Sequence, residues 1–166
     1  MGPEQYGTFS FIISFVSIAG FTLFSVDSLI MKRLHEHPDQ TKEILGSGLI
    51  IKLINGLFTV SAATVAGILF ANTASTTWMI FVYSTFTIFQ SISVIDFYFR
   101  IHALNKPVSI LGTIVTLIMS VFKIVVVANG LPIIWLLFGY VIDQILGGIG
   151  YIYLYKKYII ALQLAK

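Results

Sequence analysis

The chain of 166 residues is 57% hydrophobic and only 10% charged, whereas roughly a quarter of the residues are charged in an average soluble domain. This composition excludes an ordinary soluble globule, which needs more polar residues to cover its surface. The absence of cysteine excludes disulfides and cysteine metal sites, and the formal charge of +3 comes without the aromatic-interleaved basic patch of a nucleic-acid-binding protein, so we expect no nucleic-acid partner.

Five apolar stretches are separated by short polar, Gly or Pro segments, and each is long enough for the roughly 20 residues of a membrane-spanning helix. We predict an all-α fold, a polytopic membrane helix bundle with five transmembrane helices in a single domain over residues 1–166. The short connections make neighbouring helices antiparallel. The predicted spans cover about residues 8–31, 44–70, 77–98, 107–128 and 131–155.

Basic residues outside these spans are confined to one side of the predicted bundle, and such residues collect in cytoplasmic loops. We therefore predict an outside N-terminus and a cytoplasmic C-terminus. A short N-terminal tail crosses a membrane poorly by itself, so we expect that a preceding helix is missing from this chain. The residues that set this orientation are Lys32, Arg33, Lys42, Arg100, Lys106, Lys156, Lys157 and Lys166.

Each charged residue inside a span costs about 2.5 to 3.5 kcal/mol on insertion into hydrocarbon. Such residues are therefore expected to have a structural or functional role. Asp27 lies near the inner end of the first span and Lys52 well inside the second, and antiparallel neighbours could bring the two together. Two interpretations stay open. Either the two residues form a buried pair that supports the fold, or Lys52 faces a central cavity and attracts an anionic ligand.

The third and fourth spans carry charges closer to their ends. Asp96 and Arg100, near the inner end of the third span, have the i,i+4 spacing of a helical ion pair, and we predict a structural pair at the interface. Lys123 is close to the outer end of the fourth span, from which its long side chain can snorkel.

Asp143 is the most deeply placed charge, about 18 Å from either end of the fifth span at 1.5 Å per residue. A carboxylate cannot snorkel over that distance. Gly139 and Gly147 lie one turn to either side on the same helix face, a small-residue surface that allows close helix approach or a ligand. Asp143 is therefore either a hydrogen-bonded residue that joins helices or part of a cavity or proton relay.

Catalytic constellations are missing from the sequence. It contains no nucleophile elbow, nucleotide-binding loop or zinc-protease motif. His35, His37 and His102 lie in or beside the predicted cytoplasmic loops, without the carboxylate or cysteine ligands of a metal site. We expect no enzymatic activity, no cofactor and no metal.

Short segments spread over nearly the whole chain have distinctive sequences. They are residues 2–10 (GPEQYGTFS), 26–33 (VDSLIMKR), 43–46 (EILG), 95–100 (IDFYFR) and 151–157 (YIYLYKK). Together they resemble segments of Wzx-type polysaccharide flippases, including O-antigen flippases, in the multidrug/oligosaccharidyl-lipid/polysaccharide exporter superfamily.

The resemblance implies two lobes of helices around a central cavity, within the cell inner (cytoplasmic) membrane. Its substrate would be an undecaprenyl-pyrophosphate-linked oligosaccharide, moved to the outer leaflet. The five spans would correspond to the second through sixth helices, so the chain would be a fragment that works with the remaining helices of a full-length transporter and with membrane lipid.

The resemblance also implies roles for the charged residues. Lys52 and Arg100 would attract the pyrophosphate, and Lys123 would serve the outward-facing state. Asp27 or Asp143 would couple ions to transport.

Two other functions stay open on sequence grounds. One is half of a drug/cation antiporter from the same superfamily, which a test of anionic-lipid dependence would separate from a flippase. The other is a non-transporting membrane scaffold that oligomerises through its Gly and Ser faces.

Overall fold

The computed structural model consists of helices joined by short connections, and it describes residues 3–20, 22–71 and 73–164. No strand occurs among these residues. The elements are α1 (Pro3–Ala19), α2 (Thr22–Glu36), the 3-10 helix η1 (Pro38–Gln40), α3 (Thr41–Phe70), α4 (Ala74–Ser84), α5 (Phe86–Gln90), the 3-10 helix η2 (Ser91–Ser93), α6 (Val94–Ile101), α7 (Asn105–Ala128) and α8 (Ile133–Leu164).

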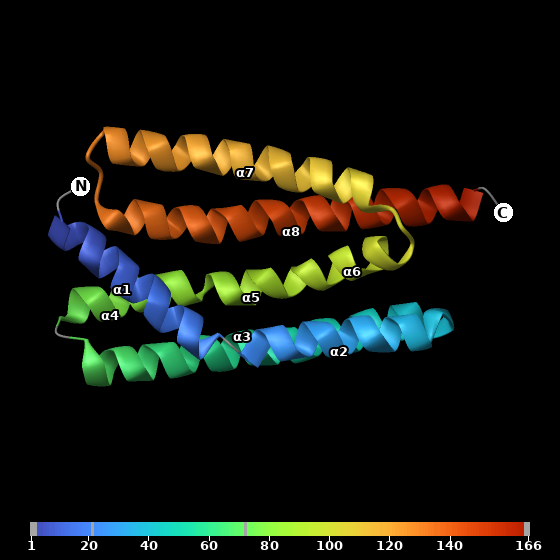
Figure 1. Ribbon diagram of the computed structural model, residues 1–166, viewed down its shortest axis with the longest axis horizontal. Helices are drawn as coiled ribbons and strands as arrows, with labels where there is room; N and C mark the ends of the chain where they lie inside the picture. The colour runs from blue at the N-terminus through green and yellow to red at the C-terminus, as the bar shows by residue number, and fades with distance from the viewer. Residues whose placement is uncertain (1–2, 21, 72, 165–166) are drawn as a thin grey trace.

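The helices run back and forth along one long axis (Figure 1). The start of α1 and the connections after α3 and α7 lie at one end, and the connections after α2 and α6 and the end of α8 lie at the other. The all-α fold and the antiparallel order of neighbours are therefore confirmed. The loops predicted to be cytoplasmic share one end, although the orientation in a membrane stays a prediction.

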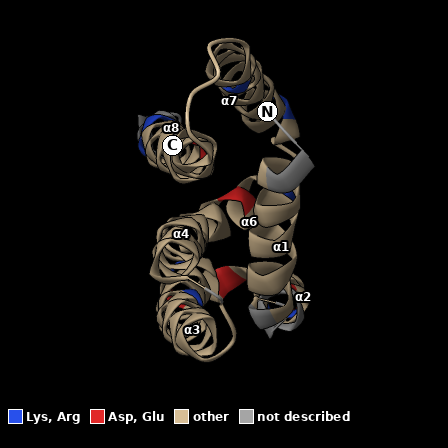
Figure 2. Cartoon of the chain, turned by 90° about the vertical axis from the view of Figure 1, so that its left-hand side faces the viewer, with Lys and Arg blue, Asp and Glu red and all other residues tan. Residues whose placement is uncertain are grey.

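The helices pack largely side by side. α8 packs against α7 and against α4 and α5, while α3 packs against α4, α5 and α2. Figure 2, an end view, shows α7 and α8 toward one side, α2 and α3 toward the other, and α1 alongside. The segment from α4 to α6 is thus the central element on which the site depends.

Four helical segments of the described chain are long and apolar enough to cross a membrane. Their outward faces carry large apolar side chains, such as Phe58 on α3 and Leu117 on α7, which are more than half exposed. Such a surface suits lipid rather than water, and the chain is a multi-pass membrane protein. The four segments are Pro38–Phe70, Ala74–Ile101, Asn105–Ala128 and Ile133–Tyr158.

The predicted first span, residues 8–31, is wrong as a single helix. α1 ends at Ala19 and α2 begins at Thr22, and the apolar part of α1, Gln5–Ile18, is shorter than the four spans. Gly20 follows α1, and glycine costs a helix about 1 kcal/mol relative to alanine. The two helices also pack on different partners, α1 mainly on α4 and α2 mainly on α3. The count of five spans stays a prediction.

The third span, from α4 to α6, is irregular in its middle. Hydroxyl groups there donate to carbonyl oxygens of the preceding turn, Thr85 Oγ1 to Phe81 O at 3.0 Å and Thr87 Oγ1 to Ser84 O at 2.7 Å. This back-bonding competes with the regular helical pattern and bends helices. The irregular stretch is also where the span is most polar.

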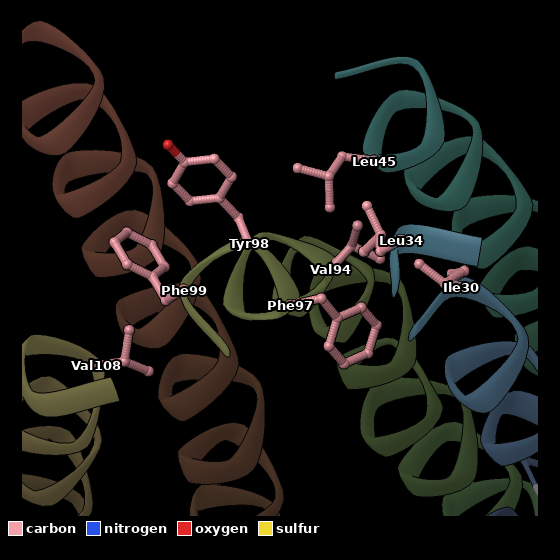
Figure 3. Packing of buried hydrophobic residues seen from close by; sticks show 8 residues of the cluster. All are labelled: Ile30, Leu34, Leu45, Val94, Phe97, Tyr98, Phe99 and Val108. Carbon is pink, nitrogen blue, oxygen red and sulfur yellow. The ribbon is translucent and has the colours of Figure 1, made fainter. Parts of the chain in front are cut away.

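Two apolar clusters pack the interior, one toward each end of the bundle. One joins α1, α3, α4 and α8 and includes Ile12, Ala63 and Leu137. Between the clusters, α3 buries two polar residues, Lys52 and Thr59. The second cluster joins α2, α3, α6 and α7, and Figure 3 shows its members Ile30, Leu34, Leu45, Val94, Phe97, Tyr98, Phe99 and Val108.

Candidate functional site

Lys52 is the central residue of the buried polar region. Gly48 lies one turn before it on α3 and Gly56 one turn after it, both buried. A Cβ at Gly48 would come within 2.9 Å of the Ile30 side chain, and one at Gly56 within 3.1 Å of Thr87 O. The glycines let α2 and α5 approach α3 closely, and Lys52 is consequently only 2% exposed.

Asp27 on α2 is the charge partner of Lys52. Lys52 Nζ lies 2.7 Å from Asp27 Oδ1 and donates a hydrogen bond to Ser93 Oγ of η2 at 3.2 Å. It also lies 5.5 Å from the centroid of the Phe97 ring, within the range of a cation–π contact. The pair is asymmetric, because the Lys52 side chain is 3% exposed and the Asp27 side chain 37%.

A cavity of about 170 Å³ adjoins this pair where α1, α2, α3 and α5 meet. It brings a carboxylate, an ammonium, hydroxyls and an amide to one partly open cavity. The lining is largely apolar, but these polar groups and the volume suit several water molecules or one small polar group. The residues that line it are Val16, Ser17, Gly20, Asp27, Lys52, Phe86, Thr87 and Gln90.

Asp96 and Arg100 form a second ion pair, on α6. Arg100 Nε and Nη2 both lie 2.6 Å from Asp96 Oδ2. The Asp96 side chain is 10% exposed and that of Arg100 57%, so the carboxylate is held inside and the guanidinium faces outward. The centroid of the Phe97 ring lies 5.9 Å from Arg100 Cζ, so the same ring lies near both Arg100 and Lys52.

Lys123 on α7 lies over an aromatic ring. Its Nζ is 3.7 Å from the ring centroid of Tyr140 on α8. Tyr140 meets Tyr83 of α4 edge-on, with centroids 5.4 Å apart, and lies 6.4 Å from Phe9 of α1. This aromatic cluster could not be predicted from the sequence, because its members Phe9, Tyr83 and Tyr140 come from three helices distant along the chain.

Asp143 lies half-buried on α8, away from the Lys52 cavity. Within the described part of the chain, no ion pair or hydrogen bond joins it to another residue. Gly139 and Gly150, on the same helix, face Phe122 and Leu111 of α7. The surroundings of Asp143 therefore include the close contact between α7 and α8.

The structure thus groups the candidate residues unequally. It brings Asp27 together with Lys52, keeps Lys123 and Asp143 outside both ion pairs, and adds Ser93 and Gln90 to the polar region. Gln90 lies inside the third predicted span, residues 77–98. Ser93 could not be singled out, because no local signal connects η2 to α3.

The side chains of His35 and His102 hold local contacts. Nδ1 of His35 lies 3.0 Å from Met31 O, and Nδ1 of His102 lies 2.8 Å from Tyr98 O, each one helical turn back. Across the described residues, no group of three or more potential metal ligands is gathered.

Comparison with known proteins gives one match. A family model described as polysaccharide biosynthesis protein matches residues 1–165. No curated protein and no solved structure matches the chain.

Proposed function

Because the chain belongs to the polysaccharide biosynthesis protein family, we propose that it is part of a flippase for lipid-linked oligosaccharide in the cytoplasmic membrane. Members of this family are transporters rather than enzymes. The long apolar helices and lipid-suited outer surface accord with that role. The proposed substrate is an undecaprenyl-pyrophosphate-linked oligosaccharide, carried without making or breaking bonds for surface polysaccharide biosynthesis.

The observation that carries the proposal is the Lys52–Asp27 pair beside a cavity that also holds polar side chains. A structural pair alone would need no cavity, whereas a pair that exchanges partners needs room for the incoming group. A pyrophosphate oxygen can make the same charge-assisted contact with Lys52 Nζ that Asp27 Oδ1 makes at 2.7 Å. Asp27, partly exposed, could then take up a cation or a proton, which would couple transport to an ion.

The other charged residues are less suited to the first contact with pyrophosphate. Arg100 directs two nitrogens at Asp96, so its charge is already balanced. Lys123 lies on Tyr140 near the end predicted to face outward, which fits contact with substrate after reorientation. Asp143 remains a second candidate for ion coupling.

The test removes both charges of the pair at once in the full-length native protein. The Asp27→Asn/Lys52→Met double variant leaves no unpaired charge, so it separates transport from folding. At matched protein amounts in the membrane, we expect surface polysaccharide to fall about tenfold or more, because one charge-assisted contact contributes about 1.5 to 3 kcal/mol.

Lys42→Met is the matched control, since Lys42 is an exposed lysine at the start of the same helix. It should export normally. Normal surface polysaccharide from the double variant would refute the assignment of Lys52 to substrate binding.

A further inference from the structure

A second polar cavity lies where α6, α7 and α8 meet. Its volume is about 420 Å³, within the roughly 300 to 1,000 Å³ of small-molecule sites. It is at the end of the bundle that holds the connection between α6 and α7 (Figure 1). Its lining residues are Asp96, Arg100, Asn105, Val108, Ser109 and Tyr151.

The polar groups of this cavity are mostly uncommitted. Arg100 contacts Asp96 Oδ2 through Nε and Nη2. Arg100 Nη1 and Asp96 Oδ1 therefore remain available to a ligand. Within the described chain, the side chains of Asn105, Ser109 and Tyr151 make no hydrogen bond to another residue. The cavity therefore presents an acceptor oxygen, a guanidinium donor, an amide with both functions, and two hydroxyls.

This set of groups selects a class of ligand by charge. A phosphate would meet the Asp96 carboxylate, and the guanidinium that could attract it is already neutralised. A cation would be repelled by the guanidinium of Arg100. A neutral sugar ring has adjacent hydroxyls that each donate and accept, which matches a mixed set of donors and acceptors.

We propose that this cavity binds a neutral sugar ring of the transported glycan, an inference that rests on the proposed flippase function. Its position relative to Lys52 supports the assignment. Lys52 Nζ and Arg100 Cζ lie 5.5 and 5.9 Å from the centroid of the same Phe97 ring. A pyrophosphate near Lys52 would therefore leave the sugars attached to it within reach of the cavity.

The experiment measures sugar binding directly in the full-length protein in lipid nanodiscs. The probes are methyl glycosides of glucose, galactose and N-acetylglucosamine, titrated by saturation-transfer NMR. We expect at least one to bind, and Ser109→Ala/Tyr151→Phe to raise its Kd about tenfold, because two hydrogen bonds of roughly 0.5 to 1.5 kcal/mol each are lost.

The matched control is Ser120→Ala/Tyr153→Phe, which makes the same changes on α7 and α8 at exposed residues that do not line the cavity. It should leave the Kd unchanged. The proposal would be overturned if no glycoside bound, or if both double variants bound it as the unchanged protein does.

Surface polysaccharide from cells reports separately on the flippase. Export by the unchanged protein, combined with glycoside binding insensitive to Ser109 and Tyr151, would reject the sugar site and keep the transport function. Sensitive binding in a protein that exports nothing would support the sugar site and reject the transport function.

Discussion

Replacing Asp27 with asparagine is expected to destabilise the protein more than replacing Lys52 with methionine, although Lys52 is the more buried residue. Asp27→Asn leaves an ammonium that is 3% exposed with only neutral acceptors, Ser93 Oγ and the asparagine amide oxygen. Removal of one partner from a buried pair costs about 3 to 5 kcal/mol, and we expect about 3 kcal/mol here. Lys52→Met leaves a carboxylate whose Oδ1 is buried but whose side chain is 37% exposed beside the cavity, so we expect a smaller loss of about 1 to 2 kcal/mol.

Thermal denaturation of the purified protein in detergent, followed by size-exclusion chromatography, measures this order. Asp27→Asn should have the lowest midpoint, Lys52→Met an intermediate one, and the double variant a midpoint nearer to that of the unchanged protein. Additive losses in the double variant would show that the two charges do not stabilise each other, and would contradict the pairing.

The second large effect is expected at Gly56, where two helix backbones meet. A Cβ there would lie 3.1 Å from Thr87 O and 3.2 Å from Ile88 Cα, which are backbone atoms that no side-chain rotation can move. Gly56→Val would push α3 away from α5, and overpacking of this kind costs roughly 1 to 3 kcal/mol. We expect a loss near the upper value, measured as a lower denaturation midpoint.

Gly46→Val on the same helix is the matched control, because a Cβ at Gly46 meets nothing within 4 Å. Its midpoint should equal that of the unchanged protein or exceed it, since valine favours helix more than glycine does. If Gly56→Val and Gly46→Val have the same denaturation midpoint, the close approach of α3 and α5 is wrong.

Hydropathy and turn signals predicted most of the fold. The second through fifth spans are long apolar segments bounded by polar, Gly or Pro residues, so their location follows from local sequence. The break between α1 and α2 did not follow, because both helices are apolar near Gly20 and only their different packing partners separate them. Nor did the irregular middle of the third span, which depends on which hydroxyls donate back to carbonyl oxygens of the helix.

The candidate site was predictable in part. Insertion cost identifies Asp27 and Lys52 as residues that need a reason to be in a membrane, and antiparallel order makes them neighbours. The sequence could not place Ser93 or the Phe97 ring beside Lys52, because these contacts join elements about 40 residues apart. The cavity beside Asp27 depends on the break after α1, and it was missed for the same reason.

If the Lys52 cavity is wet and accepts substrate, Gln90, which lines it, is reached by water and covered by substrate. The most direct measurement is labelling of Gln90→Cys in a cysteine-free full-length protein with a charged, water-soluble thiol reagent, in the presence and absence of the lipid-linked oligosaccharide. We expect labelling that the substrate suppresses, and no labelling of Val65→Cys, a position on α3 with a 57% exposed side chain that we expect to face lipid. An unlabelled Gln90→Cys, or labelling that substrate leaves unchanged, would contradict a cavity that is wet and accepts substrate.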